Sequence, residues 1–172
     1  MSIIKKNIVI KNLLNNLPII ILLLSVLNEI DFNYVGSKYL SFNFPFILIF
    51  YWSLTKPDSL GYGFIFIAGL INDVVLGLPI GISSLSYLLV CGFATYLKNI
   101  TLRPSLVKDW IFFLFTILVI NSLIYILLIL FFSFEFELIE RLINLLITFF
   151  LYVIFAHIFQ LYQKFFLGTN NE

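Results

Sequence analysis

Asp73 is the residue whose type and position most clearly suggest a chemical role in this chain. Between Phe64 and Pro79, Asn72 and Asp73 are the strongly polar side chains in an otherwise apolar stretch. A charged side chain within such a span costs about 2.5–3.5 kcal/mol on insertion scales, so it generally has a function or a specific partner. We expect Asp73 either to lock the local fold or to anchor a partner helix or a ligand.

Few other side chains in the sequence could act as a catalytic acid, base, nucleophile or metal ligand. The single histidine, His157, and the single cysteine, Cys91, lie in apolar runs. We interpret the histidine as a hydrogen-bonded packing residue and the cysteine as a small hydrophobic residue. One Cys and one His make no zinc ligand set, and the sequence shows no nucleotide-binding loop and no nucleophile–base pair. The sequence therefore predicts a protein that is not an enzyme and has no metal and no cofactor.

The composition indicates a membrane protein. The 172-residue chain is 62% hydrophobic and 11% charged, with a mean hydropathy of +1.09, whereas soluble domains are about 45–50% apolar and 25% charged. The apolar runs are long and continuous, which favours helices over a β-barrel as the way to satisfy the backbone in lipid. The net charge of +1 gives no attraction to nucleic acid.

Six apolar segments predict an all-α integral membrane protein with six transmembrane helices and short loops, in one domain over residues 1–172. The segments are residues 13–30, 43–55, 60–78, 82–97, 110–133 and 140–163. The second is short and could be re-entrant. No small-residue cleavage site follows the first, so we expect an uncleaved anchor helix.

Basic residues predict that the N- and C-termini are cytoplasmic. With this orientation eight of the ten lysines and arginines lie inside, and Lys38 and Arg141 lie outside, which is the positive-inside bias. We expect the acidic residues Glu135, Glu137 and Glu140 to form a solvated outer loop.

The third and fourth segments predict a tight helical hairpin. Gly69, Asp73 and Gly77 recur every fourth residue and share one helical stripe, where glycines let a neighbouring helix come close. Pro79 prevents the helix from continuing, and Gly77 and Gly81 permit a tight turn.

The fourth segment carries a polar stripe of its own, which includes Ser83 and Tyr87. Counting back from the turn places Ser86 and Tyr87 at about the depth of Asp73. We therefore expect Asp73 to hydrogen-bond across the hairpin to Tyr87 or Ser86.

This part of the chain resembles the bacterial rod shape-determining protein MreD family. The motifs that carry the resemblance are Phe44-Pro45, Tyr51-Trp52, Pro57-Asp58, Gly61-x-Gly63, Gly69-Leu-Ile-Asn-Asp73, Gly77-Leu-Pro79-Ile-Gly81 and Leu85-Ser-Tyr87-Leu88. Outside residues 44–97 the agreement is in length, span count and hydrophobicity. The resemblance makes Asp73, Gly77, Pro79 and Gly81 candidates for a functional surface, and the predicted hairpin adds Gly69 and Tyr87.

The resemblance implies a non-catalytic scaffold of the cell-elongation complex, or elongasome, in the bacterial inner membrane. Such a protein is needed for rod shape and lateral peptidoglycan synthesis. The implied partners are an MreC-like bitopic protein, an MreB-like actin homologue, a RodA-type glycan polymerase with its transpeptidase, and membrane lipids.

Two other functions use a similar framework. A substrate-binding subunit of a vitamin-type or other small-molecule transporter is an alternative. The resemblance implies it, because the MreD family is thought to share a six-helix shape with the substrate-binding subunits of vitamin transporters. Such subunits commonly dock through small residues on the first span, but residues 13–30 contain no Ala or Gly. A proton-coupled carrier would need polar groups and broken helices in two related halves, and one half of this chain has them.

Overall fold

The computed structural model describes residues 16–27, 42–100, 105–132 and 138–167. These residues form helices and no strand, which confirms the predicted all-helical fold. The α-helices are α2 (Leu17–Leu27), α3 (Phe44–Thr55), α4 (Tyr62–Leu76), α5 (Ile82–Ile100), α6 (Leu106–Phe132) and α7 (Leu138–Tyr162). Each overlaps one of the six predicted segments. Lys38, Glu135, Glu137 and the N-terminal lysines lie outside the described residues.

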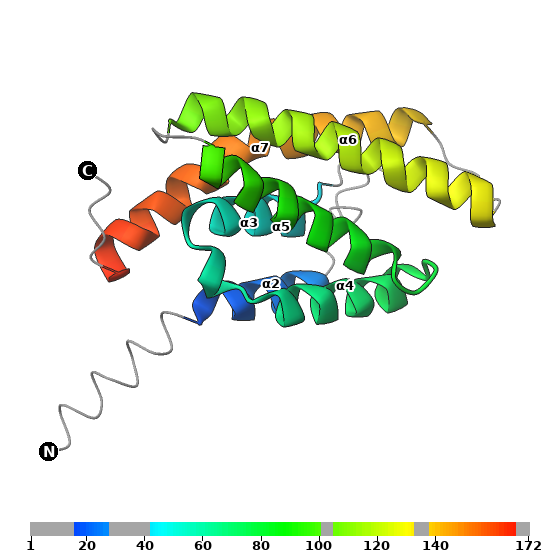
Figure 1. The fold of residues 1–172 in the computed structure, drawn as a ribbon, viewed down its shortest axis with the longest axis horizontal. Helices are drawn as coiled ribbons and strands as arrows, with labels where there is room; N and C mark the ends of the chain where they lie inside the picture. The colour runs from blue at the N-terminus through cyan, green and yellow to red at the C-terminus, as the bar shows by residue number, and fades with distance from the viewer. Residues whose placement is uncertain (1–15, 28–41, 101–104, 133–137, 168–172) are drawn as a thin grey trace, which may run out of the picture.

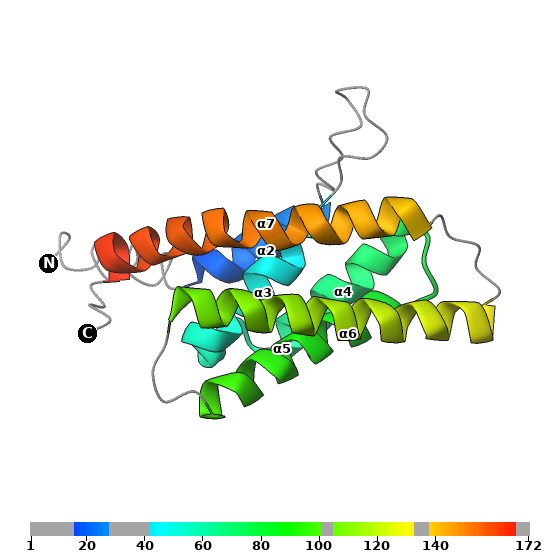
Figure 2. The ribbon, with the colours of Figure 1, turned by 90° about the horizontal axis from the view of Figure 1, so that it is seen from above.

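The helices lie in three layers of two (Figure 1). α2 and α4 form one outer layer, α3 and α5 the middle layer, and α6 and α7 the other outer layer. Seen from above, α6 and α7 are the two longest helices and lie next to each other, with α2, α3 and α4 visible between them and α5 extending beyond α6 (Figure 2). The longest helices therefore form one face of the bundle.

α3 is the central helix of the core. Its residues Pro45–Ser53 are all buried, as expected for a helix that is hydrophobic on every side. Twelve residues span about 18 Å, which is less than the roughly 30 Å of a bilayer core. Asn43 begins this helix by accepting a hydrogen bond from the backbone N–H of Phe46 at 3.3 Å. The short second segment is thus enclosed by its neighbours.

Within the described part of the chain, two helical segments are long and apolar enough to cross a membrane. They are Leu106–Phe132 and Ile139–Phe165, each of 27 residues, or about 40 Å of helix. α2, α3 and α4 are shorter apolar helices. The predicted six spans and cytoplasmic termini therefore remain a prediction.

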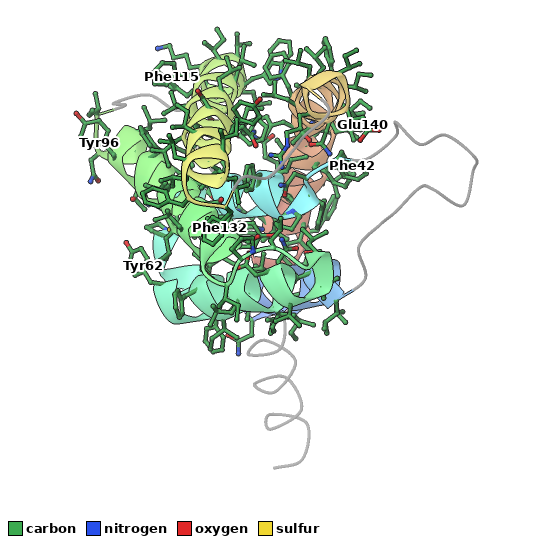
Figure 3. All side chains as sticks on the ribbon, turned by 90° about the vertical axis from the view of Figure 1, so that its right-hand side faces the viewer. Phe42, Tyr62, Tyr96, Phe115, Phe132 and Glu140 are labelled. Atoms are coloured by element: carbon green, nitrogen blue, oxygen red, sulfur yellow. The ribbon has the colours of Figure 1, made fainter. Side chains whose placement is uncertain are left out.

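The exterior of the bundle is rich in large apolar side chains. Tyr62 on α4, Tyr96 on α5, and Phe115 and Phe132 on α6 point outward (Figure 3). Exposed apolar surface on this scale is unusual for a soluble monomer and fits contact with lipid. The core and the exterior are both apolar, as in proteins that fold within a membrane.

Candidate functional site

Asp73 is fully buried near the end of α4, with 0% of its surface exposed. Its Oδ2 accepts a hydrogen bond from the backbone N–H of Gly81, and its Oδ1 accepts one from the backbone N–H of Ser83, both at 2.7 Å. Free amides at a helix start are stabilised by a capping oxygen and by negative charge. Asp73 therefore caps α5 from the preceding helix.

The expected partnership with Ser86 is wrong. The Ser86 hydroxyl donates to the carbonyl of Ile82, one turn back in its own helix, at 2.8 Å. Asp73 bonds instead to backbone amides because the turn brings the start of α5 directly over the carboxylate. Tyr87 is buried on α5 and lines the cavity described below.

The turn between α4 and α5 has the predicted tight geometry. Gly77 has φ 64° and ψ 27°, in the left-handed region, and Gly81 has φ 104°. The backbone N–H groups of Gly77 and Leu78 both donate to the Asp73 carbonyl, the latter at 2.9 Å. One residue thus holds both ends of the turn, through its backbone on α4 and its side chain on α5.

Close packing continues below the turn. A Cβ added to Gly69 would lie 2.5 Å from the backbone N of Ser84 and 2.8 Å from its Oγ, so no larger residue fits there. The Ser84 hydroxyl donates to the Phe66 carbonyl at 3.1 Å, and Asn72 Nδ2 donates to Ser83 Oγ at 2.9 Å. The glycine and the polar residues together bring the two helices into contact.

A cavity of about 710 Å³ opens between the helices at the end of the bundle that contains this turn, which we call the hairpin end. Its polar lining comes from five helices and the residue that precedes α3: Ser25, Asn43, Asn72, Ser83, Ser86, Tyr87, Asn121, Ser122, Tyr125, Glu140, Arg141 and Asn144. Asp73 is not among the lining residues. The carboxylate that stood out in the sequence supports the wall of the cavity from behind, through Ser83.

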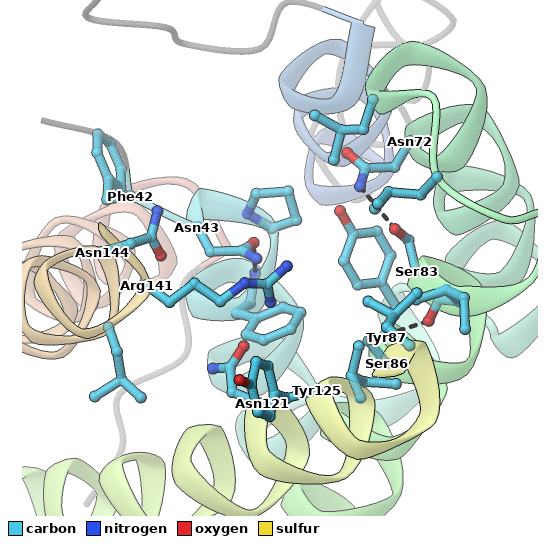
Figure 4. A pocket seen from close by; sticks show the side chains of 18 of the residues that line it. Phe42, Asn43, Asn72, Ser83, Ser86, Tyr87, Asn121, Tyr125, Arg141 and Asn144 are labelled. Atoms are coloured by element: carbon cyan, nitrogen blue, oxygen red, sulfur yellow. Dashed lines mark hydrogen bonds between the residues drawn. The ribbon is translucent and has the colours of Figure 1, made fainter. Parts of the chain in front are cut away.

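Arg141 extends from α7 into the middle of this cavity (Figure 4). Asn43 lies on one side of it, and Asn121 and Tyr125 lie on the other. The positive-inside bias places Arg141 on the outer side, and Arg141 is not one of the site residues predicted from the sequence. Glu140 also lines the cavity, so the expectation that it belongs to a solvated loop is wrong, because α7 already begins at Leu138.

A signal for this face of α7 was present in the sequence. Arg141, Asn144 and Thr148 are spaced by three and four residues, so they share one side of a helix. The structure turns that side inward: Thr148 is buried, accepts a hydrogen bond from the backbone N–H of Asn43 and donates to the Asn144 carbonyl. A polar stripe that begins with an arginine indicates an interior site.

The opposite end of the bundle is tied by smaller polar contacts. Lys98 Nζ donates to the Thr55 carbonyl at 3.2 Å, and the buried Cys91 accepts from Ser53 Oγ at 3.2 Å. His157 is exposed on α7, so its interpretation as a packing residue is wrong, because its side of the helix faces outward. No three His, Cys, Asp or Glu side chains in the described ranges are grouped to hold a metal ion.

The fold and the site define an α-helical membrane protein with a cavity inside the bundle that is lined by many polar side chains. A family model described as rod shape-determining protein MreD matches residues 11–167, nearly the whole chain. The chain belongs to this family, whose members are membrane components of the rod-shape system that also includes MreB- and MreC-type proteins. No curated protein and no solved structure matches the chain.

Proposed function

We propose that this protein is a non-catalytic, multi-pass scaffold of the cell-elongation complex in the bacterial inner membrane. It holds partner helices in place for lateral peptidoglycan synthesis. Its proposed partners are an MreC-like bitopic protein, an MreB-like actin homologue, and a RodA-type polymerase with its transpeptidase. Six crossings, with both termini cytoplasmic, are part of the proposal.

The bonding of Asp73 is the observation that carries a scaffold role. Both carboxylate oxygens accept charge-assisted hydrogen bonds from backbone amides, and the side chain is excluded from solvent. A catalytic carboxylate must reach a substrate, whereas this one is committed to fixing a turn. The rigidity of the hairpin is therefore what Asp73 supplies.

The fixed turn presents an apolar tip. Ile80 is 78% exposed, and Val74, on the last turns of α4, is 72% exposed. Gly77, Pro79 and Gly81 give this tip its shape. We propose that a partner helix docks against this tip and the adjacent face of α4, with Asp73 and Gly69 acting from inside as its support.

A tagged pull-down in mild detergent tests the scaffold role, with bound proteins identified by mass spectrometry. The wild type is expected to recover an MreC-like protein together with the wall-synthesis enzymes. Asp73→Ala should lose them because the turn loosens, and Ile80→Ser should lose them while leaving the fold intact.

Gly63→Ala is the matched control, because a Cβ at Gly63 meets nothing within 4 Å. It should recover the same proteins as the wild type. Recovery of an ATPase pair or a transport subunit instead would overturn the scaffold and favour the transporter alternative.

A further inference from the structure

The cavity at the hairpin end contains a cationic side chain surrounded mainly by neutral hydrogen-bonding groups. Its volume of about 710 Å³ falls within the 300–1,000 Å³ typical of small-molecule sites. A cavity of this size and polarity has room for a bound group larger than a few waters. Arg141 and the amide groups of Asn121 and Asn144 are not needed to explain the scaffold role.

Arg141 supplies the charge. A guanidinium presents five N–H donors in a rigid fork, a geometry that matches phosphate and carboxylate groups. Charged side chains inside membrane helices face the bundle interior or a cavity and generally mark a functional site. Arg141 lies near the start of α7, which is near a membrane boundary if this helix crosses the bilayer.

Neutral donors and acceptors surround the guanidinium. Three amide side chains, of Asn43, Asn121 and Asn144, come from the α3 and α6–α7 side of the cavity (Figure 4). Asn72, Ser83 and Tyr87 line it from the α4–α5 hairpin. Such groups match the hydroxyls of a polyol or sugar, which both donate and accept hydrogen bonds.

The remaining lining is apolar and continuous with a lipid-type exterior. Phe42, Phe44 and Phe46 line the cavity from the α3 side, and Leu118 and Leu128 line it from α6. α6 also exposes large apolar side chains on its outer surface, among them Leu130 and Phe131. A ligand with an acyl or other hydrocarbon tail could therefore place its headgroup inside while its tail follows the helices.

We propose that this cavity binds the headgroup of an anionic lipid, with a phosphate at Arg141 and hydroxyl groups at the surrounding amides and hydroxyls. Glu140 lines the same cavity, so the site favours a headgroup with one negative charge over one with several. A glycerophospholipid with a polyol headgroup and a glycolipid with a single phosphate share this chemistry. The site is independent of the proposed scaffold function.

Native mass spectrometry of the purified protein in mild detergent tests this site, because bound lipids keep their mass. Phosphatidylglycerol is added to the delipidated protein, with phosphatidylcholine as the neutral-headgroup comparison and glycerol phosphate as the headgroup without a tail. The wild type should retain phosphatidylglycerol in preference to phosphatidylcholine. Arg141→Gln should weaken that retention about tenfold, the scale of one charge-assisted contact.

Two variants complete the design. Asn121→Phe keeps Arg141 but fills the cavity, and it should also lose retention. In the wild type the Asn121 amide donates to the Ile117 carbonyl of its own helix. Lys164→Gln removes an exposed positive charge beyond the opposite end of α7 and should retain lipid like the wild type. Thermal unfolding of each variant shows whether it is folded.

The bound species decides the source of the headgroup. A co-purified glycerophospholipid or a co-purified glycolipid phosphate, lost in Arg141→Gln, supports the site and names its ligand. Retention of glycerol phosphate as strong as that of the lipid would overturn the lipid assignment. Equal retention in the wild type, Arg141→Gln and Asn121→Phe would overturn the site itself, even if partner recovery were normal.

Discussion

The carboxylate of Asp73 accepts a hydrogen bond from the backbone N–H of Ser83 at 2.7 Å, so a side chain near the end of α4 caps the beginning of α5. A second amide, of Gly81, bonds to the other oxygen. Capping from a different helix couples two elements that would otherwise be joined only by the turn. The stability of the hairpin should therefore depend strongly on this one side chain.

Asp73→Ala should lower the free energy of unfolding by about 3 kcal/mol, because the partly buried amide of Gly81 and the buried amide of Ser83 both lose a charged acceptor. The free energy of unfolding of Asp73→Asn should lie between those of the wild type and Asp73→Ala. The Asn amide oxygen can accept a hydrogen bond from one backbone N–H, but its NH₂ group faces the other N–H and cannot accept from it. Unfolding in mixed detergent micelles measures both. Val74→Ala, at an exposed neighbouring position, is the control, and Asp73→Ala with the same stability as this control would contradict the capping role.

Gly69→Ala should destabilise the fold by about 1–3 kcal/mol, the usual cost of overpacking. The added methyl group would collide with the Ser84 backbone, which cannot move away as a flexible side chain would. Gly63→Ala in the same helix meets open space and should be neutral or stabilising by up to about 1 kcal/mol. Equal thermal stability of the two variants would show that α4 and α5 are not in contact at Gly69.

Gly77→Ala tests backbone conformation without a steric contact, because a Cβ there meets nothing within 4 Å. The left-handed conformation of Gly77 should cost about 1–2 kcal/mol with alanine. Gly77→Asn should recover part of this loss, since Asn tolerates that region better. If alanine and asparagine have the same thermal stability, the turn must adopt another conformation.

The sequence predicted the helices well, because each corresponds to a long apolar run. It also identified the Gly69–Asp73–Gly77 stripe, since residues four apart share a helix face. The partner of Asp73 was missed because a five-residue turn decides which amides face the carboxylate, and side-chain spacing along α5 does not contain that information.

Arg141 was missed for a different reason. Its role depends on the rotation of α7 and on the approach of Asn43 and Asn121, which are distant in the sequence. An arginine at the edge of an apolar run fits a membrane boundary equally well. Only the packed bundle shows that this one extends into a cavity.

The orientation of the bundle in the membrane can be tested with cysteine labelling, because the native Cys91 is buried and accepts a hydrogen bond from Ser53. It should react slowly and leave a low background. Ile80→Cys places a thiol at the exposed tip of the turn, which the positive-inside bias assigns to the outer side. It should react with a membrane-impermeant maleimide in cells whose inner membrane is intact.

Lys164→Cys places the matching thiol at an exposed position beyond the end of α7, on the side predicted to be cytoplasmic. It should react only after the inner membrane is permeabilised. Mass-tagged maleimide and gel mobility measure both reactions. Labelling of Lys164→Cys in intact cells, with protection of Ile80→Cys, would invert the topology and place the Arg141 cavity on the cytoplasmic side. Labelling of both thiols in intact cells would place residues 80 and 164 on the same side of the membrane. The chain would then cross the membrane an even number of times between them, which contradicts the three crossings predicted there.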